Sequence, residues 1–124
     1  LTIYFFYGLK ALICFSISAL IGVLLLETVN YIEHYGLRRT KTKTGYSKVL
    51  PIHSWNSDHL VGRILLFELS RHSDHHLDGS TPFWKLRPHT DTPTLRWGYY
   101  ASWWPCVITP IWRRVMTPRL PVSD

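Results

Sequence analysis

Cysteine, glycine-rich loops and acidic side chains are all scarce in this sequence of 124 residues. Its two cysteines, Cys14 and Cys106, lie far apart and form no CxxC pattern, which argues against a disulfide framework or a cysteine zinc site. We expect both to be inert packing thiols. The glycines are dispersed without a GxGxxG or GxxxxGK pattern, so nothing supports nucleotide binding. Only 8 acidic residues oppose 14 Lys and Arg, which leaves a net charge of +6.

The position of the basic residues favours a membrane partner over nucleic acid. They follow apolar segments, as the positive-inside rule predicts for the cytoplasmic side of a membrane. The residues concerned are Arg38, Arg39, Lys41, Lys43 and Lys48, then Arg113, Arg114 and Arg119. Aromatic residues gather at the edges of the apolar stretches, where their half-polar rings suit a bilayer surface. We therefore expect the six tryptophans to act mainly as interfacial anchors: Trp55, Trp84, Trp97, Trp103, Trp104 and Trp112.

The first segment, residues 1–36, predicts a transmembrane helix. Lys10 is the only charge within residues 3–26, and this run matches the roughly 20 helical residues that cross a hydrocarbon core. A signal peptide is disfavoured because no AxA-like cleavage site follows the run. Gly36 is the expected helix end. Since Leu1 already borders the apolar run, we expect the chain to be part of a longer polypeptide.

Three further segments follow in the predicted order. In residues 37–58 apolar side chains do not recur at any regular spacing, which indicates a cytoplasmic loop. In residues 59–77 apolar side chains recur at partly helical spacing and no proline interrupts them, which predicts one helix. Residues 78–124 predict a loop and then an interfacial aromatic segment that does not span, because prolines interrupt it. The predicted fold class is an all-α membrane protein, the C-terminal part of a transmembrane helix bundle with a cytoplasmic histidine-rich cap.

The sequence RHSDHH at residues 71–76 is the most informative chemical pattern. His72, His75 and His76 stand at i, i+3 and i+4, so a helix presents them on one face. Three imidazoles on one face favour a metal site over the alternative, a solvated histidine-rich helix end. Imidazole binds zinc, copper, iron or nickel, so the pattern alone does not identify the metal.

A second pattern, NYIEHYG, puts His34 at the end of the membrane helix beside Glu33. Ionisable groups at such a position are usually functional or extend to water, and both interpretations stay open for His34 alone. Glu33, Glu68 and Asp74 are candidate outer carboxylates that orient ligand imidazoles, or else ordinary solvated charges. Of the other histidines, we expect structural hydrogen bonds from His53 and His59 and a solvated side chain at His89.

Four stretches, NYIEHYGLRR, PIHSWNSDHL, LLFELSRHSDHH and PIWRRVMTPRL, resemble in this order the C-terminal part of membrane alkane 1-monooxygenases. The resemblance implies a non-haem diiron centre of two iron ions, held by histidines of the boxes HExxxH, ExxxHH, NYxEHYG and RHxxHH. The last two boxes correspond to His34 and to His72, His75 and His76. The first two are absent, so the resemblance implies that a missing N-terminal region supplies the other ligands. We predict that this fragment alone is inactive.

The implied activity is terminal hydroxylation of an alkane by O2, with electrons from rubredoxin and rubredoxin reductase. The implied location is the cell inner membrane, in contact with lipid and multi-pass in the complete protein, with the histidine boxes facing the cytoplasm. Residues 77–88, LDGSTPFWKLRP, look closer to xylene and cymene methyl-hydroxylating enzymes. Fatty acyl desaturases also use histidine boxes and are a further alternative. The non-enzymatic alternative is an interfacial membrane segment without a metal site.

Overall fold

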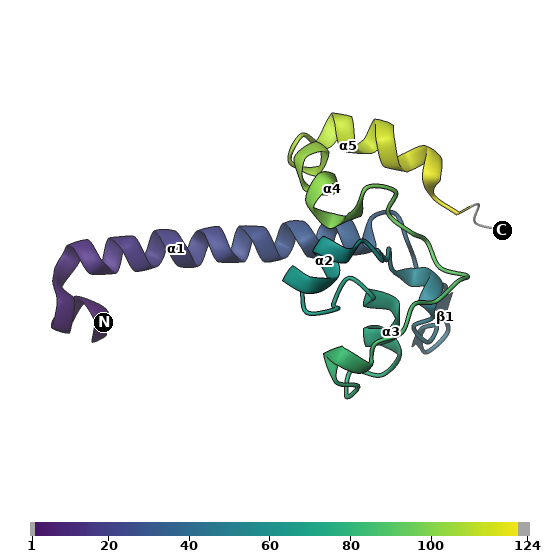
Figure 1. The fold of residues 1–124 in the computed structure, drawn as a ribbon, viewed down its shortest axis with the longest axis horizontal. Helices are drawn as coiled ribbons and strands as arrows, with labels where there is room; N and C mark the ends of the chain where they lie inside the picture. The colour runs from purple at the N-terminus through teal and green to yellow at the C-terminus, as the bar shows by residue number, and fades with distance from the viewer. Residues whose placement is uncertain (1, 122–124) are drawn as a thin grey trace.

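A long N-terminal helix projects from a small folded unit that gathers around its C-terminal end (Figure 1). The computed structural model describes residues 2–121. The helices are α1 (Thr2–His34), α2 (Leu60–Leu65), α3 (His72–Leu77), α4 (Gly98–Val107) and α5 (Thr109–Met116). A two-stranded antiparallel hairpin, β1 (Lys41–Thr42) and β2 (Gly45–Tyr46), follows α1. Short 3-10 turns occupy Pro51–His53, Phe83–Lys85 and Thr117–Arg119. The protein is thus mostly helical.

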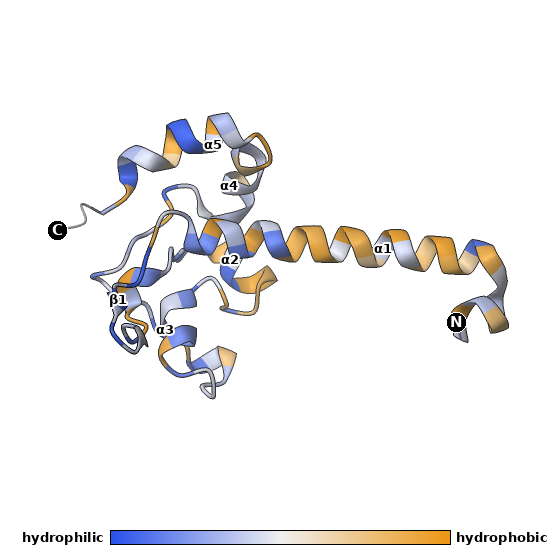
Figure 2. Cartoon of the chain, turned by 180° about the vertical axis from the view of Figure 1, so that it is seen from behind, coloured by the Kyte–Doolittle hydropathy of each residue, from blue (hydrophilic) through white to orange (hydrophobic). Residues whose placement is uncertain are grey.

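Helix α1 is long and apolar enough to cross a membrane. None of its most apolar 18-residue window is buried within the described structure, and Figure 2 shows apolar colouring along this projecting part. The hydroxyls of Ser16 and Thr28 donate to the carbonyls of Leu12 and Leu24 within the same helix. Such internal bonding suits a hydrocarbon environment, where no water is available as a partner. Gly8, with φ of 78°, bends the first turns away from the rest.

Helix α1 ends at His34, and the chain turns two residues later at a glycine. Gly36 adopts a φ of 70°, a left-handed conformation that glycine adopts with little strain. A Cβ atom there would also collide with Cδ2 of Leu120, so the close approach of the C-terminal segment favours a glycine. This turn directs the chain back along the end of α1.

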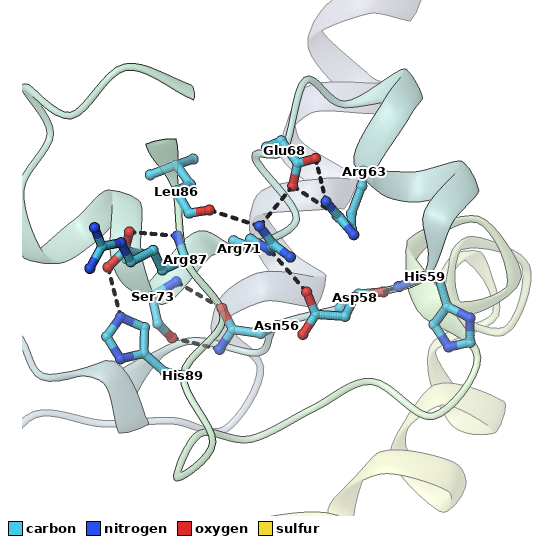
Figure 3. Close-up of polar contacts among 12 residues, drawn as sticks. Asn56, Asp58, His59, Arg63, Glu68, Arg71, Ser73, Leu86, Arg87 and His89 are labelled. Carbon is cyan, nitrogen blue, oxygen red and sulfur yellow. Dashed lines mark hydrogen bonds and ion pairs between the residues drawn. The ribbon is translucent and has the colours of Figure 1, made fainter. Parts of the chain in front are cut away.

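The prediction of one helix over residues 59–77 is wrong. Two short helices, α2 and α3, are separated by a turn in which Phe67 and Glu68 have φ values of 50° and 60°. Arg63 donates two hydrogen bonds of 2.8 Å to the Glu68 carboxylate, and Arg71 lies 3.3 Å from the same group (Figure 3). These ion pairs fix the turn and, led by the hydrogen bond from Arg63, lower the pKa of Glu68. These tertiary contacts therefore interrupt the single helix that the spacing of apolar residues predicted.

The segments predicted as loops contain more structure than expected. Residues 37–58 include the β1–β2 hairpin and a 3-10 turn, and residues 78–124 include α4 and α5. Pro110 stands in the first turn of α5, where its missing N–H costs little. Neither α4 nor α5 is long enough to span a membrane, in agreement with the sequence prediction.

A small apolar core joins α4 and α5 to the end of α1. Its buried members are Ile32, Trp55, Leu95, Tyr99, Cys106, Trp112 and Met116. The anchor role expected for every tryptophan is therefore wrong for Trp55 and Trp112, which are fully enclosed, whereas Trp84 and Trp104 are exposed. Cys106 packs as predicted, while Cys14 is exposed on α1. The core holds the last turn of α1 in place, and this turn carries Glu33 and His34.

Candidate metal centre

His34 closes α1 with its ring held in one orientation. Its Nδ1 lies 3.3 Å from the backbone carbonyl oxygen of His53. A carbonyl only accepts, so Nδ1 carries the proton and donates, which leaves the lone pair on Nε2. This hydrogen bond is the kind of outer contact that fixes the tautomer of a metal-ligating histidine.

Helix α3 brings two more imidazoles to the same point. Nε2 of His34 lies 3.3 Å from Nε2 of His72 and 3.3 Å from Nε2 of His76. The three candidate ligand atoms all lie within 4.8 Å of one another. His72 and His76 stand four residues apart on α3, which is the spacing that places two side chains on one helical face. The structure therefore brings together three of the four predicted ligand residues.

The nitrogen spacing fits a shared cation. Metal–imidazole bonds of about 2.0–2.1 Å place two nitrogens about 3.3 Å apart around a tetrahedral ion. Burial, reinforced by the neighbouring imidazoles of His76 and His34, lowers the pKa of His72 to about 3. Burial likewise lowers the pKa of His76. Both rings are therefore neutral near pH 7, the form that binds metals.

Glu33 lies closer to the histidine cluster than an outer carboxylate was expected to be. Its Oε2 is 3.2 Å from Nε2 of His72, and the residue is only 5% exposed. Because His72 is neutral, this contact is not an ion pair between opposite charges. The Glu33 side chain instead places an oxygen atom beside the ligand nitrogen of His72. Tyr99, whose pKa is raised by burial and by the nearby Glu33 carboxylate, packs against the same site.

The other predicted site residues surround the cluster without joining it. The ring of His75 is centred 5.9 Å from that of His72 and 5.8 Å from that of His76, outside the group of three converging nitrogens. In the described part of the chain, the Glu68 carboxylate bonds to arginines, as Figure 3 shows. Asp74 accepts from the backbone N–H of Arg87 and lies 2.8 Å from Nε2 of His89. These carboxylates thus have partners other than the ligand imidazoles.

Sequence reasoning missed the role of residues 51–58. His53 was expected to make a structural hydrogen bond, and its ring accepts one from the backbone N–H of Leu50. The carbonyl of His53, however, is what orients His34. His59 contacts the carbonyl oxygen of Arg96, as a structural histidine would. The solvated role expected for His89 is wrong, because Asp74 holds its ring. Backbone contacts of this kind leave no signal in side-chain patterns.

Comparisons with known proteins find relatives in the enzyme family that the two histidine motifs resemble. Residues 1–110 match the sequence profile of the fatty acid desaturase family. The chain is 41% identical over 115 residues to alkane 1-monooxygenase 2 of Alcanivorax borkumensis, which covers 92% of the chain and 30% of the relative. It is 42% identical over 104 residues to alkane 1-monooxygenase of Acinetobacter baylyi, covering 83% of the chain and 26% of the relative.

A more distant relative has a name that refers to a different class of hydrocarbon. The xylene/toluene monooxygenase hydroxylase component of Pseudomonas putida is 33% identical over 95 residues, covering 77% of the chain and 24% of the relative. The chain therefore spans about 30% or less of the length of the curated relatives described here.

Proposed function

Because the chain belongs to the fatty acid desaturase family, we propose that it forms part of a membrane alkane monooxygenase, corresponding to the C-terminal part of such enzymes. The observation that carries this proposal is the convergence of His34, His72 and His76, which come from the two motifs that resemble alkane 1-monooxygenases. Homologues with that name are about 40% identical over most of the chain. A hydroxylase built on a histidine metal centre is the function that this geometry supports best.

The proposed cofactor is a pair of non-haem iron ions. His34, His72 and His76 would hold one ion through Nε2, and His75, the remaining histidine of the two motifs, would serve the second. The remaining ligands would come from a region outside these 124 residues. Imidazole donors fit iron as well as other transition metals, and the Glu33 carboxylate offsets part of the positive charge. When bound, such a centre activates O2, so that an alkane, O2, two electrons and two protons give an alcohol and water.

The residues of the chain have further roles in this proposal. Helix α1 anchors the site at a bilayer, where an alkane substrate dissolves. The buried surroundings of His72 and Glu33 exclude water, which protects a reactive centre from side reactions. We propose that the site faces the cytoplasm from the inner membrane, since the basic loop after α1 obeys the positive-inside rule. That side is accessible to rubredoxin and rubredoxin reductase as electron donors.

A second candidate substrate is a methyl group on an aromatic ring. The relative named xylene/toluene monooxygenase hydroxylase component and the stretch LDGSTPFWKLRP support it. The chemistry at the metal would be the same, and only the shape of the substrate pocket would differ. Product analysis with n-octane and with p-xylene, supplied to the same preparation, distinguishes the two candidates.

The test of the proposed function uses the complete gene product in membranes, supplied with rubredoxin, its reductase, NADH and n-octane. We expect 1-octanol and bound iron in the unaltered protein, and neither in His72→Ala. His59→Ala is a matched control, because this histidine contacts the carbonyl of Arg96 rather than the cluster. Iron content that does not change in His72→Ala would contradict the proposed metal centre. Iron binding without oxidation of either hydrocarbon would contradict the proposed reaction.

A further inference from the structure

The segment at residues 51–58 bonds to both helices that carry the converging histidines. On the α1 side, the backbone N–H of Trp55 donates to the carbonyl of Glu33 at 2.8 Å. The carbonyl of His53 accepts from Nδ1 of His34 at 3.3 Å. Trp55 is buried in the core, so this attachment is rigid. One side of the segment is therefore fixed to the last turn of α1.

The opposite side of the segment bonds to α3 through a buried asparagine. Oδ1 of Asn56 accepts from the backbone N–H of Ser73 at 2.9 Å, and Nδ2 of Asn56 donates to Oγ of Ser73 at 2.6 Å (Figure 3). The Ser73 hydroxyl donates to the carbonyl of Pro51 at 2.6 Å. Asn56 is 8% exposed and Ser73 1%. Ser73 directly follows His72, so these bonds act on the ligand helix itself.

Helix α3 depends on such outside contacts for its position. It has six residues, and its N-cap residue, Arg71, makes no side-chain capping bond. Isolated helices of this length are unstable in water, and their first N–H groups need partners. Asn56 supplies one of these partners from another segment, in the role that an N-cap side chain normally has. Arg71 is in turn held by Asp58 at 2.9 Å.

The asparagine is itself held in place by its backbone. Its N–H donates to the carbonyl of Pro93 at 2.8 Å, and its carbonyl accepts from the N–H of Leu95 at 2.8 Å. Asn56 and Thr94 form an isolated parallel bridge. The side chain of Asn56 thus projects toward α3 from a fixed support.

We infer that Asn56, acting through Ser73, is a positioning residue that sets the distance between Nε2 of His34 and the Nε2 atoms of His72 and His76. This inference rests on the proposed metal centre. It predicts that the two residues govern metal geometry although neither touches the metal. Because they act through one contact, removing both should cost little more than removing Asn56 alone.

The test uses the complete gene product in detergent, with Co²⁺ as a probe whose visible absorption reports coordination geometry. The variants are Asn56→Ala, Ser73→Ala and the double variant. Outer contacts of metal ligands typically contribute about 10- to 100-fold to affinity. We expect a loss of that order in Asn56→Ala, a changed absorption band, and no further loss in the double variant. Met116→Ala, a buried core change on α5, should lower the melting temperature while leaving the band and the Co²⁺ affinity unchanged.

The outcomes separate the inference from the proposed function. No Co²⁺ bound at the cluster in the unaltered protein would overturn the metal centre and, with it, the inference. Binding by the unaltered protein, with the same affinity and absorption band in Asn56→Ala and Ser73→Ala, would overturn the inference alone. Should Asn56→Ala fail to fold, Ser73→Ala decides the question, because it keeps the backbone N–H that Asn56 caps. Equal effects in Met116→Ala would also overturn the inference.

Discussion

Removing His34 is the most direct perturbation of the candidate centre, because this residue makes both of the 3.3 Å nitrogen contacts that bridge α1 and α3. His34→Ala leaves His72 and His76 as the nitrogen donors at that point. Its ring is partly exposed and lies outside the apolar core, so the fold should persist. The expected result is a folded, membrane-inserted protein that has lost most of its metal affinity.

The size of the loss follows from the number of ligands. Four-ligand zinc sites in small peptides have apparent binding free energies of about 10–16 kcal/mol, or about 2.5–4 kcal/mol per ligand. Loss of one ligand therefore weakens binding by roughly 100- to 1,000-fold. Titration with Co²⁺ against a competing chelator measures this change. In His34→Gly, added imidazole should restore part of the absorption band, because it can occupy the space of the missing ring.

His59→Ala serves as the control for this prediction. It also removes an imidazole, but one whose Nε2 contacts the carbonyl of Arg96 instead of another histidine. Affinity should stay within about threefold of the unaltered protein, a difference below 1 kcal/mol. Unchanged Co²⁺ affinity in His34→Ala, or equal losses in both variants, would refute the reasoning from nitrogen geometry.

Three further predictions concern pH, the end of α1 and the membrane. Burial lowers the pKa of His72 from 6.5 to about 3, so the unfolded chain takes up a proton between these values that the folded chain does not. The contribution of His72 to the free energy of unfolding of the metal-free protein should therefore fall by about 2 kcal/mol from pH 7 to pH 5, as measured by denaturant titration of the unaltered protein and of His72→Gln; equal pH profiles of the two proteins would contradict this. Gly36→Ala, forced against Leu120 at a positive φ, should destabilise the fold by about 1–2 kcal/mol in thermal melts, whereas unaltered melting would show that the turn tolerates a side chain. Leu20→Arg, on the exposed apolar face of α1, should disfavour insertion by about 3 kcal/mol in a glycosylation-mapping assay, and equal insertion would argue against a spanning helix.

Local patterns in the sequence predicted the parts of this structure that depend on local physics. The apolar run and Gly36 predicted where α1 ends, because hydrophobic length and glycine conformation are properties of the segment itself. The i, i+4 spacing predicted that His72 and His76 share a face of α3. That His34 would meet them was predicted only through the family resemblance, since nothing in the spacing links residues 38 positions apart.

Non-local contacts explain what the sequence did not predict. The turn between α2 and α3 depends on the ion pairs of Glu68. The spacing of apolar residues gives no information about such ion pairs. His75 was grouped with its neighbours, whereas the cluster found among residues 2–121 joins His34 with His72 and His76. The function of Asn56 rests on hydrogen bonds to Ser73, 17 residues away. Each case requires knowledge of which distant segments pack together.

The arrangement of protons at the cluster favours a cation over a purely structural role. Nδ1 of His34 donates to a carbonyl, so its Nε2 presents a lone pair toward the Nε2 atoms of both His72 and His76. If Nε2 of His72 carried the proton, its buried Nδ1, which has no partner among the described residues, would keep an unpaired lone pair. If Nδ1 carried it, that buried N–H would have no acceptor among the described residues, and the Nε2 lone pairs of His34 and His72 would face each other at 3.3 Å. Either state costs free energy without a cation. A metal ion bound to the three Nε2 atoms would turn this repulsion into coordination, and Glu33 would balance part of its charge.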